Sequence, residues 1–181
     1  MLIAVCFPTS AATELQDKIF SKAKETKSMT SVFIQKRQLS ILPLPLISKG
    51  IFNYHHETGI VWETQEPIQS RIIISKEGIQ TEDKFASTKT EGSSQLSEIL
   101  LSLFSGDSVT LETYFSIRAK GDANQWNLLL KPKNNLMAAQ VASISIKGRE
   151  SVESLYIVES NGDYSNLEFS SSRINRLSDK F

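Results

Sequence analysis

The sequence has little cysteine, little histidine and no excess of either charge, and each shortage excludes a class of protein. Among its 181 residues, 20 lysines and arginines balance 20 aspartates and glutamates, so we find no basic stripe for nucleic acid. No apolar run is long enough to cross a bilayer as a helix. The only cysteine is Cys6, so no disulfide is available and a hydrophobic core must hold the fold together.

Motifs that carry enzyme chemistry are also missing. The chain contains no G-x-S-x-G, Walker A, G-x-G-x-x-G or H-E-x-x-H motif. The only histidines, His55 and His56, are adjacent, so on a strand they point to opposite faces and do not share a metal ion. Glu63, Glu66 and Asp83 lie among polar positions typical of a solvated face. The sequence therefore favours a non-enzyme without cofactor or metal, and a serine hydrolase using one histidine stays open as a third hypothesis.

The first twelve residues read MLIAVCFPTSAA, which is apolar, uncharged and closed by small residues. Small residues of this kind are what signal peptidase requires at its cleavage site. We predict a secretory signal peptide, or its remainder, over residues 1–12 and one domain over residues 13–181. The alternative is a buried N-terminal strand. Lipid attachment at Cys6 is disfavoured because Val5 stands where a lipobox has a smaller residue.

Hydrophobic spacing predicts two helices. Leu15, Ile19 and Phe20 recur at helical spacing within residues 13–27. A second apolar stripe predicts a helix over residues 94–105, which Gly106 ends. Its members are Leu96, Ile99, Leu100, Leu103 and Phe104.

Alternation with period two, together with turn residues, predicts short antiparallel strands. The predicted ranges are 31–39, 50–55, 59–65, 70–75, 78–83, 109–118, 126–131, 141–147, 154–159 and 163–170. Asn161-Gly162 is a strong signal for a hairpin turn. Residues 84–92 are predicted as a loop, residues 134–140 as a short helix or irregular, and the polar tail from Ser171 as a frayed end.

The segment Ile41–Ile47, with sequence ILPLPLI, is apolar but contains two prolines that cannot donate to a sheet ladder. We therefore place it at a sheet edge or in a loop. An exposed apolar segment of this kind would be a lining or a contact surface. The alternative is an apolar loop tucked under a helix.

Together these elements predict an α+β fold. Because most connections are too short for parallel crossovers, we expect nine or ten antiparallel strands in a curved sheet, with helices covering its concave side and enclosing an apolar cavity. The alternative is a solid core made of the same side chains. The residues predicted to line the cavity are Phe33, Phe52, Tyr54, Ile60, Trp62, Ile72, Ile74, Leu96, Ile99, Leu100 and Leu103.

A series of residues in the first half resembles a known family, the outer-membrane lipoprotein carrier proteins (LolA-like). The matching positions are Phe33, Gln35, Lys36, Pro45, Leu46, Gly50, Phe52, Tyr54, Gly59, Ile60, Trp62, Pro67, Ile72–Ile74, Gly78 and Ile79. The second half adds Trp126, Leu128, Leu130–Lys133, Ile144–Ile146, Tyr164 and Phe169. The Pro-Leu-Pro-Leu-x-Ser-x-Gly segment from Pro43 is similar to that of a divergent branch of the family.

The resemblance implies an incomplete β-barrel covered by helices, in a monomeric periplasmic protein. Such carriers take an acylated lipoprotein or other lipid from an inner-membrane transporter, shield its acyl chains and pass it to an outer-membrane receptor, without bond chemistry. The alternative is a periplasmic sensor or protein-interaction domain that binds its partner through an edge strand. Carriers have an arginine six residues before the strand tryptophan that latches the lid. His56 occupies that position here, and its imidazole has less reach.

Overall fold

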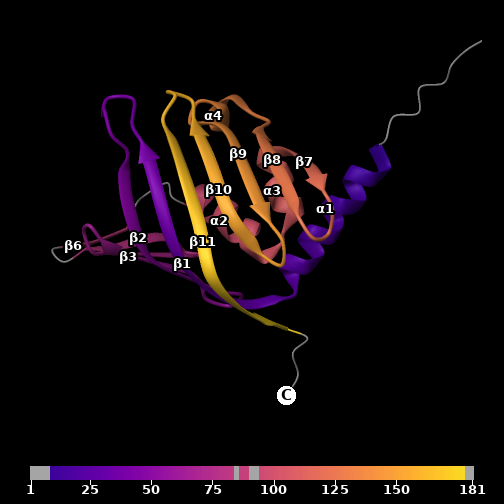
Figure 1. The fold of residues 1–181 in the computed structure, drawn as a ribbon, viewed down its shortest axis with the longest axis horizontal. Coiled ribbons are helices and arrows are strands. Elements are labelled where there is room, and N and C mark those ends of the chain that lie inside the picture. Colours follow the sequence, from indigo (N-terminus) through magenta and orange to yellow (C-terminus); the bar gives the residue numbers. More distant parts are fainter. Residues whose placement is uncertain (1–8, 84–85, 90–93, 178–181) are drawn as a thin grey trace, which may run out of the picture.

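The first and last strands of the chain lie side by side in the middle of one curved sheet (Figure 1). The computed structural model describes residues 9–83, 86–89 and 94–177. Within them, eleven antiparallel strands follow the order β6-β5-β4-β3-β2-β1-β11-β10-β9-β8-β7. The strands are β1 (Thr26–Gln38), β2 (Leu46–His55), β3 (Gly59–Glu66), β4 (Ser70–Ser75), β5 (Gly78–Asp83), β6 (Ala86–Lys89), β7 (Phe115–Gly121), β8 (Trp126–Pro132), β9 (Val141–Gly148), β10 (Val152–Glu159) and β11 (Tyr164–Arg176).

Helices cover the concave side of this sheet. The structure describes α1 (Thr9–Lys24), α2 (Ser94–Ser105), α3 (Ser108–Tyr114) and the short α4 (Asn135–Ala138). α2 contacts β4 and β5 near one edge of the sheet, α1 and α3 contact β7 at the other edge, and α2 contacts both α1 and α3. The helices therefore bridge two edges that do not pair with each other, as Figure 1 shows. The predicted α+β fold, an open curved sheet covered by helices, is confirmed.

The centre of the core is a cluster of aromatic rings on the concave face. Phe52 of β2 is fully buried, and its ring centroid lies 4.7 Å from that of Phe104 on α2 and 5.0 Å from that of Phe169 on β11. Trp62 of β3 lies 5.6 Å from Phe52 and 5.0 Å from Phe33 of β1. Because Phe52 joins three strands and α2, the cluster fixes the helical cover to the sheet by dispersion and burial of apolar area.

Several predicted elements have the observed bounds, including the strands over residues 70–75 and 78–83 and the helix over residues 94–105. The strand predicted over residues 109–118 is wrong in its first half, because residues 108–114 form α3. Val109, Thr110 and Thr113 favour strands as residue types. Asp107 decides the outcome, because its carboxylate caps the helix by accepting from the amide of Thr110 at 3.1 Å.

Further boundaries differ from prediction, among them the starts of α1, β1 and β2, which lie four or five residues earlier than expected. Residues 86–89 form β6 instead of a loop, although the segment is polar, because it pairs with β5. The tail does not fray at Ser171, because β11 continues to Arg176 beside the start of β1. The first helix ends at Lys24 and not at residue 27, because Thr26 already belongs to β1 and pairs with Arg176 of β11. Residues 134–140 contain the short helix α4, which Asn134 caps. Residues 1–8 of the predicted signal segment lie outside the described part of the chain.

Asp163 joins two loops at one end of the sheet. The predicted Asn161-Gly162 hairpin is present, with Gly162 at a φ of 92° that favours glycine. The carboxylate of Asp163 accepts from the amide of Ser40 at 2.7 Å and from its hydroxyl at 2.8 Å, and it also accepts from the side chain of Asn161. The hydrogen bond from the Ser40 amide is the main reason that the pKa of Asp163 lies below its usual 3.8.

This contact predicts how stability depends on pH. Because folding lowers the pKa of Asp163, its stabilising contribution is complete well above pH 3.8 and is lost as the pH falls through the folded-state pKa. We expect Asp163→Asn to lower the melting temperature at neutral pH, and the difference from the unsubstituted protein to shrink below about pH 3. Thermal unfolding followed by circular dichroism measures both.

A matched control is Asp17→Asn, which alters an exposed carboxylate on α1. It should leave the melting temperature at neutral pH unchanged. Equal losses for Asp163→Asn and Asp17→Asn would contradict the role given to Asp163.

Candidate functional site

The predicted cavity residues come together on the concave face, where they pack against one another. Seven of them are buried, namely Phe33, Phe52, Tyr54, Ile60, Ile74, Ile99 and Leu103. Trp62, Ile72 and Leu100 are partly buried against the same cluster. The side chain of Leu96 lies outside the described part. These ten residues therefore belong to one packed core between the sheet and the helices, and their role in binding a ligand stays a prediction.

An apolar pocket lies at the C-terminal end of α1, beside this cluster. Its free volume is about 40 Å³, room for only a few water molecules. An acyl chain therefore enters only if the surrounding helices move. Tyr54 and Leu103 are the two predicted residues that reach it. The remaining apolar wall comes mostly from four other elements and consists of Ile19, Phe20, Ala23, Met29, Phe104, Trp126, Leu128 and Val152.

Tyr54 brings a buried hydroxyl to this pocket. Its side chain is 3% exposed, and its hydroxyl has no hydrogen-bond partner among the described residues. Burial raises its pKa to about 12, so the hydroxyl stays protonated and able to donate. A buried hydroxyl without a partner is unfavourable by about 1–3 kcal/mol, and an oxygen of a ligand that reaches it would supply the missing acceptor.

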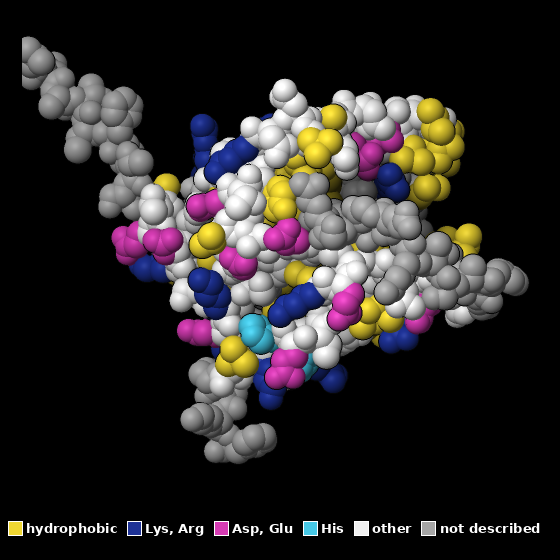
Figure 2. All heavy atoms as spheres, turned by 180° about the vertical axis from the view of Figure 1, so that it is seen from behind, with side chains coloured by type: hydrophobic (Ala, Val, Ile, Leu, Met, Phe, Trp, Pro, Cys, Tyr) yellow, Lys and Arg dark blue, Asp and Glu magenta, His cyan; other side chains and the backbone are white. Residues whose placement is uncertain are grey.

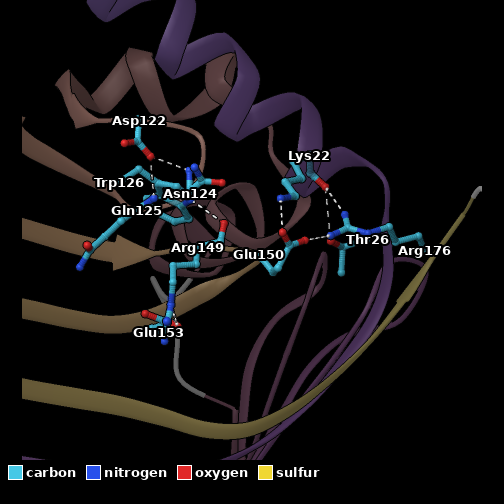
Figure 3. Close-up of polar contacts among 10 residues, drawn as sticks. All are labelled: Lys22, Thr26, Asp122, Asn124, Gln125, Trp126, Arg149, Glu150, Glu153 and Arg176. Carbon is cyan, nitrogen blue, oxygen red and sulfur yellow. Dashed lines mark hydrogen bonds and ion pairs between the residues drawn. The ribbon is translucent and has the colours of Figure 1, made fainter.

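Charged residues tie three chain segments together beside the pocket, which Lys22 and Glu150 help to line, and Figure 3 shows their contacts. Glu150, in the turn between β9 and β10, accepts from Lys22 of α1 at 2.9 Å and from Arg176 of β11 at 3.0 Å. Arg176 also donates to the carbonyl of Lys22. The hydrogen bond from Lys22 is the main cause that lowers the pKa of Glu150, so the group stays charged near neutral pH. The end of α1 is thus fastened to the sheet by contacts on the surface.

This Lys22–Glu150–Arg176 cluster was missed from the sequence. Glu150 lies in a polar turn of common type, and Arg176 lies in the tail that was predicted to fray. The two residues meet because β11 pairs with β1 along its whole length, which places Arg176 beside the end of α1. A second contact of the same turn stays within the sheet, since the indole of Trp126 donates to the carbonyl of Arg149 at 2.8 Å.

His56 lies elsewhere, in an open polar groove between the turn that follows β2 and the C-terminal end of α2. The groove holds about 560 Å³ and is also lined by Glu57, Lys76 and Asp107. The amide of His56 donates to the carbonyl of Lys27 at 2.9 Å, while its imidazole makes no hydrogen bond within the described part of the chain. A latch at His56 stays a prediction. In the structure the end of α1 is held by the contact at Glu150 together with the packing of Ile19 and Phe20.

Other site chemistry is missing from the residues that the structure describes. They contain no group of three histidine, cysteine or acidic side chains able to hold a metal ion. No hydrogen bond among them joins a serine hydroxyl to either histidine, and His55 accepts from the amide of Glu57. None of the described helices has the length and apolar character needed to cross a membrane.

Comparisons with known proteins agree with this architecture. The family model described as "Outer membrane lipoprotein carrier protein LolA-like" matches residues 9–168. No curated protein matches the chain.

Solved structures share the fold at low identity. Among them is MucB in the complex structure of Pseudomonas aeruginosa MucA/MucB, with a TM-score of 0.54 and 10% identity over 92% of this chain and 58% of that one. A crystal structure of MucB has a TM-score of 0.54 and 11% identity, over 92% of this chain and 59% of that one. This chain therefore spans less than two thirds of the MucB chains.

A LolA superfamily protein from Nitrosomonas europaea has a TM-score of 0.50 and 10% identity, over 91% of this chain and 96% of that one. At such identities the structures show the fold alone, and the family rests on the match over residues 9–168. With its open curved sheet, its helical cover and that match, the chain belongs to the LolA-like family of outer membrane lipoprotein carrier proteins.

Proposed function

We propose that the protein is a periplasmic carrier that shields the acyl chains of a lipoprotein or other lipid and moves them from the inner towards the outer membrane. The observation that carries the proposal is that helices, and not strands, cover the apolar concave face of the open sheet. Helices held by side-chain packing move without breaking a strand ladder. The cover can therefore open while the eleven-stranded sheet stays intact.

The energetics favour such an exchange. Each methylene taken from water contributes about 0.8 kcal/mol, so an acyl chain that displaces part of the helical cover compensates for the apolar packing that it disrupts. The entry point in this proposal is the pocket at the end of α1. From Tyr54 in that pocket, ring contacts lead through Phe104 and Phe52 to Trp62 and Phe33. An acyl chain that follows this row meets apolar surface along its whole length.

The alternative is an interaction domain that extends its sheet with a strand from a partner protein. MucB, which shares the fold, was solved as a complex with MucA. In this chain α1 lies along β7 at one edge of the sheet, as Figure 1 shows, so a partner strand there would have to displace the helix. The carrier function needs no strand site at this edge, and we retain it as the main proposal.

Loading of the purified protein tests the proposal directly. The protein is incubated with a synthetic triacylated lipopeptide, and separately with the same peptide without acyl chains, and is then studied by native mass spectrometry. We expect a one-to-one complex with the acylated peptide alone. Absence of a complex with the acylated peptide would exclude the carrier function, and equal binding of both peptides would favour the interaction domain.

Glu150→Gln should loosen α1 and speed lipid uptake. The substitution removes the charge that pairs with Lys22 and Arg176 on the surface, a contribution of about 1 kcal/mol or less. We expect amide hydrogen exchange in the last turns of α1 to rise by up to about fivefold, which corresponds to that free energy. We also expect faster uptake of a fluorescent fatty acid in stopped flow.

The matched control for Glu150→Gln is Glu153→Gln. Glu153 pairs with Arg149 at 2.7 Å within the same hairpin and does not reach α1. It should change neither exchange nor uptake. If both variants behave like the unsubstituted protein, the contact at Glu150 does not control the opening of α1.

Tyr54→Phe should separate ligand binding from stability. Removing a buried hydroxyl that lacks a partner should leave the melting temperature unchanged or raise it. If the hydroxyl donates to an oxygen of the bound lipid, the same change should weaken binding about tenfold, the worth of one hydrogen bond of about 1.4 kcal/mol. Isothermal titration with the lipopeptide measures the affinity.

Tyr156→Phe is the control for this measurement, because Tyr156 is 40% exposed on the outer face of β10. It should alter neither quantity. A lower melting temperature for Tyr54→Phe with unchanged affinity would show that the hydroxyl is structural.

A further inference from the structure

The two ends of the sheet differ in the chemistry of their loops. Because neighbouring strands are antiparallel, the connections after β1, β3, β8 and β10 lie at one end, and those after β2, β4, β7 and β9 lie at the other. At the first end stand five large hydrophobic side chains, which we call the apolar end. They are Ile41, Leu44, Leu46, Ile68 and Leu136.

Exposure sets these five residues apart. Ile41 is 85% exposed, Ile68 78%, Leu44 74%, Leu136 65% and Leu46 51%. Among the described residues, only one other large hydrophobic side chain is more than half exposed, Val109 on α3. Isolated exposed hydrophobic residues are normal, but their concentration on the loops of one end indicates a contact surface.

The opposite end has polar turns. Its connections consist of His56–Thr58, Lys76–Glu77, Asp122–Gln125 and Arg149–Ser151. Figure 2 shows the contrast from behind. Hydrophobic side chains gather at the upper right, where the β1–β2 loop of Figure 1 is then seen, and the histidine side chains lie towards the bottom.

The loops of the apolar end are held in place by hydrogen bonds. Ser40 is bound to Asp163, and the side chain of Gln38 donates to the carbonyls of Leu39 and Leu42 at 3.0 and 2.7 Å. The amide of Ser160 donates to the carbonyl of Gln140 at 3.1 Å, which joins the segment after α4 to the β10–β11 hairpin. The loops that carry Ile41, Leu44 and Leu136 are therefore fixed by bonds within the chain and do not depend on a partner for their position.

Cations outnumber carboxylates near the apolar end, where Lys36, Arg37, Lys49, Lys131 and Lys133 stand against Glu66, Glu159 and Asp163. Its two strand-end glutamates are neutralised, Glu159 by Arg37 at 3.0 Å and Glu66 by Lys49 at 3.6 Å. Three lysines near the same end have no acidic partner within the described chain, namely Lys36, Lys131 and Lys133. Apolar tips with a surplus of cations behind them complement an anionic lipid surface.

We propose that the apolar end docks on a bilayer that contains anionic lipid and inserts its exposed side chains at the boundary of headgroups and acyl chains. The hydrophobic tips come from three connections, and five strand spacings separate β3 from β9, roughly 24 Å along the sheet at about 4.8 Å per strand. Separate tips of this kind fit a planar, deformable phase, whereas a protein partner requires a contiguous complementary patch. The surface goes beyond the carrier function and does not require bound cargo.

Vesicle flotation with the unloaded protein tests this docking. We expect binding to vesicles of phosphatidylethanolamine and phosphatidylglycerol, weaker binding to phosphatidylcholine alone, and weakening by salt. The double variant Ile41→Ser and Leu44→Ser should lose at least about tenfold in vesicle affinity, because two apolar tips no longer insert. Val109→Ser, equally exposed but outside the apolar end, should bind like the unsubstituted protein.

A tryptophan probe distinguishes insertion from adsorption by charge alone. Leu44→Trp should shift its emission to shorter wavelength when vesicles are added, and Val109→Trp should not. The proposal is overturned if the protein binds no vesicles, if the double variant binds as well as the unsubstituted protein, or if Leu44→Trp binds without a shift. Loading with lipopeptide is measured separately in solution, so failure here leaves the carrier function untouched.

Discussion

The structure depends on one constraint, which is that its sheet does not close. β6 and β7 are unpaired with each other at opposite edges, so the concave face of eleven strands must be buried by something other than a strand. Three helices meet that need, with α2 on the side of β4 and β5 and α1 and α3 on the side of β7. A closed barrel would fix its interior by ladder hydrogen bonds on all sides, whereas here one wall is held by side chains only.

Two kinds of interaction hold that wall, and they differ in strength. In the middle, Phe104 of α2 packs on Phe52, which has no exposed area. At the rim, the end of α1 is held by Glu150 through ion pairs that water reaches, with the glutamate side chain 72% exposed. Burial of an aromatic ring contributes more than an exposed ion pair. Ile19 and Phe20 of α1 are themselves buried, so the ion pairs at Glu150 add to packing that also holds this helix.

The sequence predicts the parts of the fold and of the site that depend on local pattern. Alternation placed β4 and β5, an apolar stripe placed α2, and Phe52 was correctly assigned to the concave side, because each of these elements buries one face. α3 was not predicted, because Val109 is a strand-forming type and the capping contact from Asp107 involves one side chain. The pocket at α1 collects side chains from six elements that no sequence pattern joins. Whether they leave a void depends on packing to within a methyl group, and the observed interior is nearly full.

The geometry also bears on how a cargo would travel. The pocket with Tyr54 and Glu150 lies towards the polar end of the sheet, whereas Phe33 and Trp62, at the other end of the aromatic row, lie nearer to the apolar end. A chain that enters beside α1 therefore points its tail towards the loops that carry Ile41. In that orientation the polar head stays in water at the polar end of the sheet. The acyl tail is directed towards the apolar end, which is the end proposed to meet the bilayer.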